Sequence, residues 1–239
     1  MNPSVMLSVD GGIATIALNR PEVRNALNLA MCDALIAVSM EISSNEKIKV
    51  VFVRGNGPVF CGGADLKERT GMTEEWIRAR RLKAFAAYEA LESLPMPCIA
   101  LVHGAAIGSG VEIAAACDFI VATPEVTFRT PEAQRGTVGA TQRLPRILGK
   151  RLAKDLMFTG RALTVDEAQQ AGFVSRVVQE LDNEKEVIVK SILNATPLAL
   201  RLAKRSIDRG IELDPAGARA VEIEAIEEQL RSGSYLGKA

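Results

Sequence analysis

The choice of folds is narrowed most by one stretch of this 239-residue chain, His103-Gly104-Ala105-Ala106-Ile107-Gly108-Ser109-Gly110-Val111-Glu112. The apolar run Cys98 to Val102 before it predicts a buried strand, and the segment from Gly110 to Ala116 predicts a short helix. Glycines at such a junction let backbone N–H groups approach an anion, because the first amides of a helix have no partner within it. The stretch therefore predicts a strand-turn-helix unit whose turn can bind negative charge.

The alternation of strand and helix continues on both sides of this stretch. The predicted elements are, in chain order, a hairpin over residues 6–18 around Asp10-Gly11-Gly12, a helix capped by Asn28, a strand over 50–53, a helix over about 73–94 and a strand over 119–122. Repeated crossovers of this kind predict a largely parallel sheet with helices packed outside it. The predicted fold class is therefore α/β.

The last third of the chain has a different apolar spacing, which is almost entirely helical from Thr141 onward. The segment Thr164 to Glu167 resembles a helix capping box. Pro197 and Pro215 stand where later helices would begin. We expect a helical region here, with a soft boundary near residues 140–150.

Charge and cysteine usage exclude several classes of protein. Lys plus Arg and Asp plus Glu both total 29, so no bulk field favours nucleic acid or an anionic membrane. The four cysteines form no C-x-x-C pair, and His103 is the only histidine, so the sequence predicts reduced thiols and no metal site. No apolar run approaches the roughly 18 residues of a membrane span, and the opening residues lack a basic leader, which predicts a cytoplasmic protein.

Two carboxylates are candidates for chemistry. Glu112 lies in the apolar segment Val111 to Ala116, where a charge on the buried side of a helix needs a reason. Pro131 at a first helical position would place Glu132 in the opening turn of a helix. Each glutamate also has an ordinary interpretation, as an acid that stabilises the N-terminus of its own helix.

A serine nucleophile is an alternative, because Ser109 is flanked by glycines and His103 lies six positions earlier. The nucleophile elbow G-x-S-x-G would require glycine at position 107, which is Ile107. A dinucleotide motif would require glycine at Ile113, and no phosphate-binding G-x-x-x-x-G-K-[ST] motif occurs. A serine hydrolase therefore remains the second hypothesis from the residues alone.

Nearly the whole chain resembles the crotonase, or enoyl-CoA hydratase/isomerase, superfamily. The resemblance is carried by five ordered segments: Asn19 to Asn28 (NRPEVRNALN), Phe60 to Glu68 (FCGGADLKE), His103 to Glu112, Thr141 to Arg146 (TQRLPR) and Gly160 to Val174. It implies a crotonase (ClpP/crotonase-like) spiral of ββα turns over residues 1–145, with the CoA and catalytic site, and a C-terminal helical region for trimerisation over 146–239. It also implies a homotrimer or a dimer of trimers.

The same resemblance implies an enoyl-CoA hydratase. In the family two backbone N–H groups hold the thioester oxygen as it becomes an enolate, and these positions fall on Ala64 and Ser109. Its hydratases carry two catalytic glutamates, which fall on Glu112 and Glu132, twenty positions apart. We assign Glu112 chiefly to the water and Glu132 chiefly to the proton at Cα. Coenzyme A is part of the substrate, an acyl-CoA thioester, and no further cofactor is expected.

Substrate contacts follow from the resemblance as well, although two stretches depart from it. The implied CoA- or substrate-binding residues are Arg24, Ala26, Ala64, Asp65, Leu66, Lys67 and Gly108. After Glu132 the family's glycine-rich passage is three residues shorter here, over 136–143, and residues 231–239 lack the basic and aromatic tail common in the family. Both departures affect expectations about loop geometry and acyl specificity.

Two further alternatives come from within the superfamily. One is an enoyl-CoA isomerase of the same family, although isomerase and hydrolase members often keep only one of the two glutamates. The runs Lys67-Glu68-Arg69 and Arg78 to Lys83 look most like the methylglutaconyl-CoA hydratase branch, which includes an RNA-binding member. We expect the second run to be a solvated helix face, because the neutral chain has no extended basic stripe, and we do not expect nucleic acid as a partner.

Overall fold

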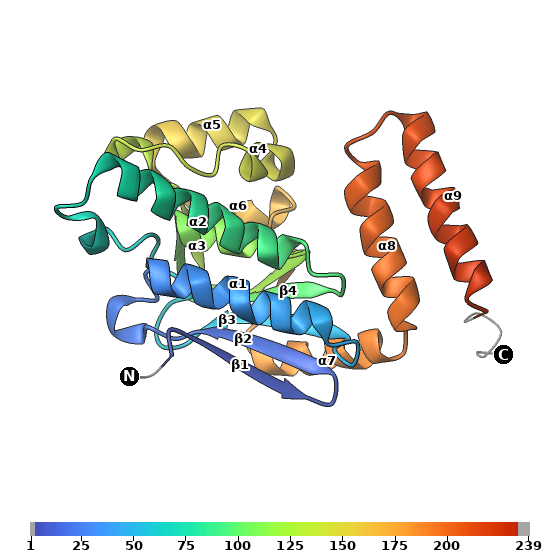
Figure 1. Ribbon diagram of the computed structural model, residues 1–239. Helices are drawn as coiled ribbons and strands as arrows, with labels where there is room; N and C mark the ends of the chain where they lie inside the picture. Colours follow the sequence, from blue (N-terminus) through green and yellow to red (C-terminus); the bar gives the residue numbers. More distant parts are fainter. Residues whose placement is uncertain (1–2, 234–239) are drawn as a thin grey trace.

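The computed structural model describes residues 3–233, and within them a six-stranded sheet forms the centre of the molecule (Figure 1). In spatial order the strands are β1 (Val5–Asp10), β2 (Ile13–Leu18), β3 (Val50–Gly55), β4 (Cys98–Val102), β6 (Phe119–Ala122) and β9 (Arg176–Val177). The hairpin partners β1 and β2 are antiparallel, and every other neighbouring pair is parallel. The largely parallel sheet predicted from the crossovers is confirmed.

A second, smaller sheet has three strands. It consists of β5 (Ala105–Ile107), β7 (Thr127–Arg129) and β8 (Ala162–Thr164), with β5 parallel and β8 antiparallel to β7. The helical region expected in the last third of the chain is confirmed, and the short strands β8 and β9 lie between its helices. Both strands are too short to show an alternation of apolar and polar residues in the sequence. They form because their backbones pair with distant strands, Phe128 with Leu163 and Val121 with Arg176. The division near residue 145 stays a prediction.

Two long helices cross one face of the main sheet, and a third covers the other (Figure 1). They are α1 (Leu29–Ser44) and α2 (Glu74–Glu92) on the first face and α7 (Leu181–Leu193) on the second. The predicted cap of α1 is confirmed, because the Asn28 side chain accepts a hydrogen bond of 2.9 Å from the backbone N–H of Met31. Thr73 caps α2 in the same way.

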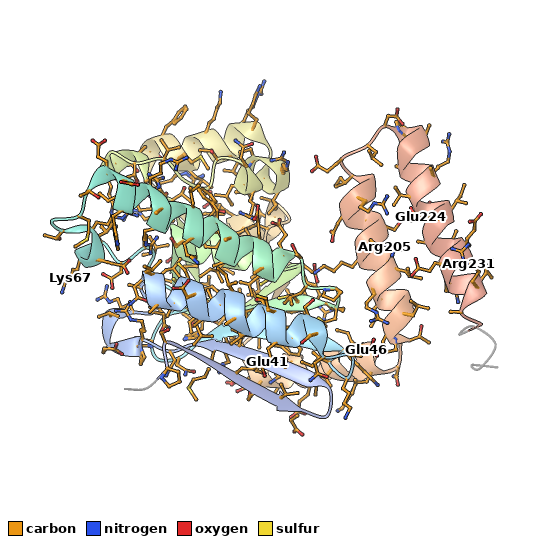
Figure 2. All side chains as sticks on the ribbon, in the orientation of Figure 1. Glu41, Glu46, Lys67, Arg205, Glu224 and Arg231 are labelled. Atoms are coloured by element: carbon orange, nitrogen blue, oxygen red, sulfur yellow. The ribbon has the colours of Figure 1, made fainter. Side chains whose placement is uncertain are left out.

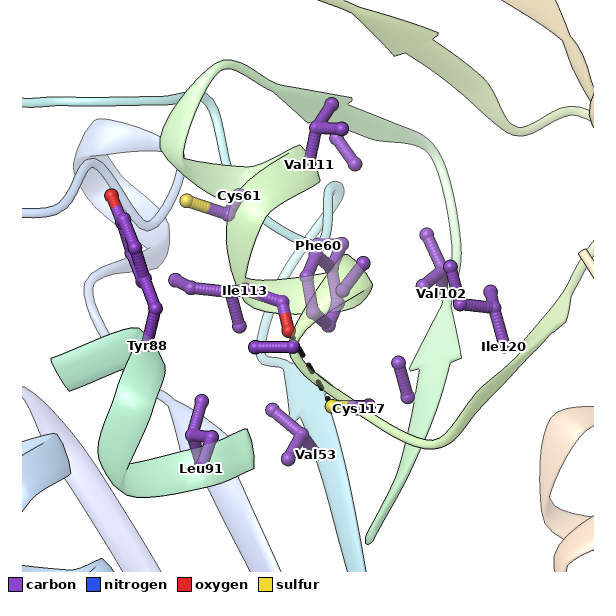
Figure 3. Packing of buried hydrophobic residues seen from close by; sticks show 14 of the residues in the cluster. Val53, Phe60, Cys61, Tyr88, Leu91, Val102, Val111, Ile113, Cys117 and Ile120 are labelled. Carbon is purple, nitrogen blue, oxygen red and sulfur yellow. Dashed lines mark hydrogen bonds between the residues drawn. The ribbon is translucent and has the colours of Figure 1, made fainter. Parts of the chain in front are cut away.

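The central strand β3 is buried on both faces. Val51 and Val53 pack in the cluster that contains the inner sides of α1 and α2, whereas Val50 and Phe52 pack with Leu181 of α7. Side chains alternate across a strand, so a strand covered on both faces is apolar throughout. Figure 3 shows the first cluster, in which Ile113, from the short helix that carries Glu112, lies among Val53, Phe60 and Leu91. This packing fixes the segments that carry the site.

The remaining elements are the helices α3 (Ser109–Ala115), α4 (Arg143–Leu148), α5 (Lys150–Thr159), α6 (Val165–Gln170), α8 (Pro197–Gly210) and α9 (Pro215–Arg231), and the 3-10 helices Pro21–Val23, Lys67–Arg69 and Ala133–Arg135. Of these, α4 and α5 lie at the top of the molecule in Figure 1 and α8 and α9 lie at its right. The capping box at Thr164 and the helix starts at Pro197 and Pro215 are confirmed. Among the helices of residues 3–233, none combines the length and apolar character that crossing a bilayer would require.

Helices α8 and α9 form an antiparallel pair that stands away from the sheet (Figure 1). Arg209 of α8 pairs with Glu224 of α9 at 3.2 Å, and Arg205 pairs with Glu228. Figure 2 shows Arg205 and Glu224 between the two helices. The pair exposes large apolar side chains at Ile207, Ile211, Ile223, Ile226 and Leu230.

Candidate active site

Two loops that supply backbone amides lie side by side. The N–H of Cys61 donates to the carbonyl of Ala105 at 3.2 Å, and the N–H of Ile107 donates to the carbonyl of Cys61 at 2.9 Å. These bonds bring Ala64 and Ser109 to neighbouring loops. Within the described residues, neither of those two amides donates to a protein acceptor. Two unpaired N–H groups are therefore available to a ligand oxygen.

A cavity of about 330 Å³ brings the four predicted catalytic groups together. Ala64, Ser109, Glu112 and Glu132 all line it. The rest of its wall comes from the loop after Ala64, from α2, and from the shortened loop after Glu132: Leu66, Arg69, Arg80, Arg81, Ala84, Phe85, Tyr88, Pro131, Arg135, Thr137, Val138, Gly139 and Ala140. The loop whose length departs from the family pattern thus forms one side of the cavity.

Glu112 is held on both carboxylate oxygens. It lies on α3 with 6% of its surface exposed, so its charge needs compensation. The backbone N–H of Ala140 donates to Oε1 at 2.7 Å, and Nη1 of Arg143 donates to Oε2 at 3.3 Å. Arg143 is itself anchored by Glu92 at the end of α2. These contacts fix the carboxylate and leave its remaining lone pairs free for a water molecule.

The carboxylate of Glu132 has fewer hydrogen-bond partners than that of Glu112 within the described residues. Glu132 caps the 3-10 helix Ala133–Arg135, where the N–H of Arg135 donates to its carbonyl at 3.0 Å. The expectation that Pro131 begins a helix with Glu132 in its opening turn is wrong, because the 3-10 helix begins only at Ala133 and Glu132 is the residue before it. The side-chain Oε2 is buried with no hydrogen-bond partner in the part of the chain described. Burial raises the pKa of Glu132, and the nearby charge of Glu112 raises it further.

Replacing Glu132 with Gln is expected to increase the free energy of unfolding at pH 7. A carboxyl group whose pKa is raised by folding contributes stability below its unfolded pKa of about 4.3, and loses that contribution as the pH rises through its folded pKa. At pH 7 the folded wild-type protein therefore loses free energy of unfolding by holding a buried, ionised carboxylate, and the neutral amide of glutamine avoids this loss. Urea denaturation at pH 7 and near pH 4 measures this, and the difference should shrink at the lower pH. A less stable Glu132→Gln protein at pH 7 would contradict it.

Gly108 makes room for Glu132. A Cβ atom at residue 108 would lie 2.6 Å from Oε1 of Glu132, and the residue has φ +50° and ψ −108°, a conformation that side chains disfavour. Gly108 was predicted as a substrate-binding residue. That role stays a prediction, and the absence of a side chain at this position, immediately before α3, also leaves room for the carboxylate of Glu132.

The predicted CoA-binding residues are only partly in the cavity. Leu66 lines it together with Ala64, whereas Arg24 and Lys67 are exposed outside it. Figure 2 shows Lys67 pointing away from the body of the protein. Asp65 forms an ion pair of 3.0 Å with Arg20, which also donates to the carbonyl of Ala26. The roles of these residues in CoA binding stay predictions.

Arg80 corrects the interpretation of residues 78–83 as a solvated helix face. Only 2% of Arg80 is exposed, its Nε pairs with Glu68 at 3.0 Å, and its Nη2 donates to the carbonyl of Leu27. Glu68 also accepts a hydrogen bond of 2.6 Å from the N–H of Leu29, the first residue of α1. Arg80 lies four residues before the buried Ala84, and residues four apart share a helix face. The sequence spacing could therefore have indicated that Arg80 is buried. Arg80 thus joins α2 to the loop that carries Ala64.

The structure does not bring His103, the candidate base, to the Ser109 nucleophile suggested by the sequence. Nε2 of His103 contacts the carbonyl of Gly57 at 2.8 Å, and His103 does not line the cavity. The Ser109 hydroxyl instead interacts with the hydroxyl of Tyr88, a buried residue whose pKa is raised by burial. Among residues 3–233 no three His, Cys, Asp or Glu side chains gather in an arrangement that could hold a metal ion.

Comparison with known proteins identifies the family. Residues 8–234 match the family described as enoyl-CoA hydratase/isomerase. The chain belongs to this family. It is 36% identical over 231 residues to the short-chain-enoyl-CoA hydratase of Clostridium acetobutylicum, covering 94% of this chain and 88% of that protein. It is 38% identical over 223 residues to the human mitochondrial enoyl-CoA hydratase domain-containing protein 2, covering 89% and 76%.

Solved structures of the family show the same crotonase fold. The crystal structure of an enoyl-CoA hydratase from Bacillus anthracis superposes with a TM-score of 0.90 at 35% identity, covering 94% of this chain and 90% of that one. A Mycobacterium smegmatis enoyl-CoA hydratase gives a TM-score of 0.92 at 31% identity, covering 96% and 91%. The crotonase fold predicted from the sequence is confirmed. Sequence reasoning did not predict that Ala140 and Arg143 would hold Glu112, although Arg143 lies in the segment 141–146 that carries the family resemblance.

Proposed function

We propose that the protein is an enoyl-CoA hydratase, which adds water reversibly across the double bond of a 2-enoyl-CoA thioester. The proposal depends on one observation: Glu112 and Glu132 line the same cavity as the residues of the two unpaired amides, Ala64 and Ser109. Hydration needs an acid, a base and a site for the developing oxyanion around one conjugated thioester. This cavity offers all three.

The amides would act on the thioester oxygen. As water attacks Cβ, electrons move through the double bond to the carbonyl oxygen, which becomes an enolate. The N–H groups of Ala64 and Ser109 would stabilise that charge, and the second of them lies at the first turn of α3, where the helix dipole adds to the effect. Backbone donors on rigid loops need little reorganisation during the reaction.

The two carboxylates would divide the proton transfers according to their surroundings. The Arg143 guanidinium and the Ala140 N–H stabilise a negative charge on Glu112, which suits a base that takes a proton from the attacking water. Burial raises the pKa of Glu132, which suits an acid that gives a proton to Cα. In the dehydration direction the two roles reverse.

The test of this function is the fate of crotonyl-CoA in ¹⁸O-labelled water. A hydratase consumes the conjugated thioester and incorporates one labelled oxygen into a 3-hydroxyacyl product. Isomerisation, the alternative within the family, moves the double bond and incorporates no label. Product without ¹⁸O, or no consumption across a panel of enoyl-CoAs, would reject the hydratase proposal.

The substitution Ser109→Ala is expected to change kcat/KM for crotonyl-CoA by no more than about threefold, because the backbone N–H survives the change of side chain. Steady-state rates of thioester loss measure this. A serine nucleophile would instead lose nearly all activity in this variant.

Assembly and location belong to the same proposal. We expect a homotrimer or a dimer of trimers in the cytoplasm, with the exposed apolar side chains of α8 and α9 covered by neighbouring subunits. Ile211 is 81% exposed in the single chain, which supports an interface there. Light scattering in solution would give the mass of the assembly, and a monomer would contradict this part.

A further inference from the structure

Arg143 connects the active-site cavity to a second cavity. The second cavity, of about 570 Å³, lies between α4, the end of α3 and helix α8. Arg143 and Glu92 line this second cavity and not the first. Arg143 nevertheless donates to Glu112, which lines the first. The carboxylate proposed as the base is therefore held from outside the cavity in which it would act.

The guanidinium of Arg143 has a different partner on each of its terminal nitrogens. Nη1 donates to Oε2 of Glu112 at 3.3 Å, and Nη2 donates to Oε2 of Glu92. The guanidinium carbon lies over the ring of Tyr88, 5.7 Å from its centroid. The contact to Glu112 is longer than the roughly 2.7–2.9 Å of a typical charge-assisted hydrogen bond, so its strength depends on small changes in the direction of the guanidinium.

Glu92 can set that direction. A guanidinium is planar and its N–H donors point in fixed directions, so holding one terminal nitrogen orients the other. An arginine side chain has many rotamers, and a partner at the far nitrogen selects among them. Glu92 therefore limits the positions from which Arg143 can reach Glu112.

The location of Glu92 is not explained by the stability of its own helix. It is the last residue of α2, whose last turn has no basic residue. A negative charge at a helix C-terminus is unfavourable, because the unpaired carbonyl groups there carry partial negative charge. Half of the Glu92 side chain is exposed, and ion pairs open to water contribute little to stability. A role in the active site accounts for the residue better than a role in folding.

We propose, on the basis of the hydratase function above, that Glu92 is a positioning residue for the Glu112 carboxylate and acts through Arg143. Without a fixed guanidinium, Oε2 of Glu112 is free to turn about the contact of 2.7 Å that Oε1 keeps with the N–H of Ala140. The carboxylate then loses its fixed direction toward the attacking water. A displacement of about 1 Å in a reacting group can cost a hundredfold in rate.

The competing interpretation is that Glu92 serves the packing of α8. Lys204 and Asp208 of that helix line the second cavity together with Glu92. Among residues 3–233, however, the carboxylate of Glu92 forms its ion pair with Arg143, and Lys204 pairs with Asp118 at 2.8 Å. The contacts of Glu92 thus lead toward Glu112 rather than toward α8.

The test measures steady-state hydration of crotonyl-CoA by Glu92→Ala and by a matched control. The control is Glu89→Ala, which removes an exposed glutamate one turn earlier on α2, outside both cavities. We expect Glu92→Ala to lower kcat about tenfold, to change KM less than about twofold, and to melt at or above the temperature of the wild type. Glu89→Ala should keep its kcat. A loss of rate without a loss of stability is a result that a purely structural residue would not give.

Dependence on Arg143 is measured in a double-mutant cycle. Arg143→Lys keeps a positive charge but lacks the planar fork that spans both carboxylates, and should lower kcat about tenfold or more. Adding Glu92→Ala to it should lower kcat less than about twofold further, because the two residues act as one unit. Glu92→Gln keeps a hydrogen-bond acceptor and should fall between the wild type and Glu92→Ala.

Two kinetic results would overturn the inference. One is a Glu92→Ala protein with the kcat of the wild type. The other is a double variant in which the two losses of rate multiply, since Glu92 would then act by a route other than Arg143. Either result leaves the hydratase function standing.

Crystal structures of the wild type and Glu92→Ala give a readout that does not depend on activity. We expect the contact between Nη1 of Arg143 and Oε2 of Glu112 to be lost in the variant, and an unchanged contact would contradict the proposal. If the wild type hydrates no enoyl-CoA and the contact is nevertheless lost in the variant, the hydratase function is rejected and the positioning role stands.

Discussion

Replacing Glu132 with Gln is expected to lower kcat for crotonyl-CoA hydration by about a hundred- to ten-thousandfold, the usual contribution of a positioned acid or base. The amide has nearly the shape of the carboxyl group but has no acidic proton to give to Cα. KM should change much less, because the thioester oxygen is bound by backbone amides in our proposal. Initial rates of thioester loss at several substrate concentrations separate the two parameters.

The control for this variant is Glu89→Gln, at an exposed glutamate of α2 outside the cavity. It removes the same charge from the chain and should leave kcat unchanged. If Glu132→Gln kept more than about a tenth of the wild-type rate, the proton at Cα would have to come from another group, and the division of roles proposed here would be wrong.

Replacing Gly108 with Ala is expected to lower kcat about a hundredfold even though no catalytic side chain is altered. The added methyl group would lie 2.6 Å from Oε1 of Glu132, so the carboxyl group must move away from its position at the start of α3. Displacement of a reacting group by about 1 Å can cost a hundredfold in rate. Steady-state kinetics and a crystal structure of the variant would show the lost rate and the shifted side chain together.

Gly136→Ala is the matched control for backbone strain. Gly136 also has a positive φ, +65°, and follows the same 3-10 turn, but a Cβ there would meet no atom within 4 Å. This variant should be less stable by about 1 kcal/mol, because alanine disfavours that backbone conformation, and should keep its rate. If both variants lost activity equally, general loop distortion rather than the collision with Glu132 would explain the effect.

Most of the fold could be predicted from local signals that survive in the tertiary structure. Three of these signals depend only on residues that are close in the sequence. They are the hairpin over residues 6–18, the helix cap at Asn28 and the prolines that begin helices at 197 and 215. The short strands β8 and β9 could not be predicted in this way. Each forms only because a distant strand offers backbone hydrogen-bond partners. Sequences of three and two residues are too short to indicate such a pairing.

The candidate site divides in the same way. The family resemblance predicted four site residues, Ala64, Ser109, Glu112 and Glu132. All four line one cavity in the structure. The contact from Ala140 to Glu112 depends on the path of a loop shorter than the family pattern, so no spacing rule could reveal it. That Nε of Arg69 has no hydrogen-bond partner among residues 3–233 likewise becomes visible only when its neighbours in space are known.

The position of β9 and α7 has a consequence for synthesis on the ribosome. The strand at the edge of the main sheet and the helix over its second face are both encoded after residue 175. Until they emerge, the nascent chain leaves the Phe52 face uncovered and the edge of β6 unpaired, a surface that invites association with other chains. Chains that end prematurely near residue 145 should therefore aggregate, even though every residue proposed for catalysis has already been made.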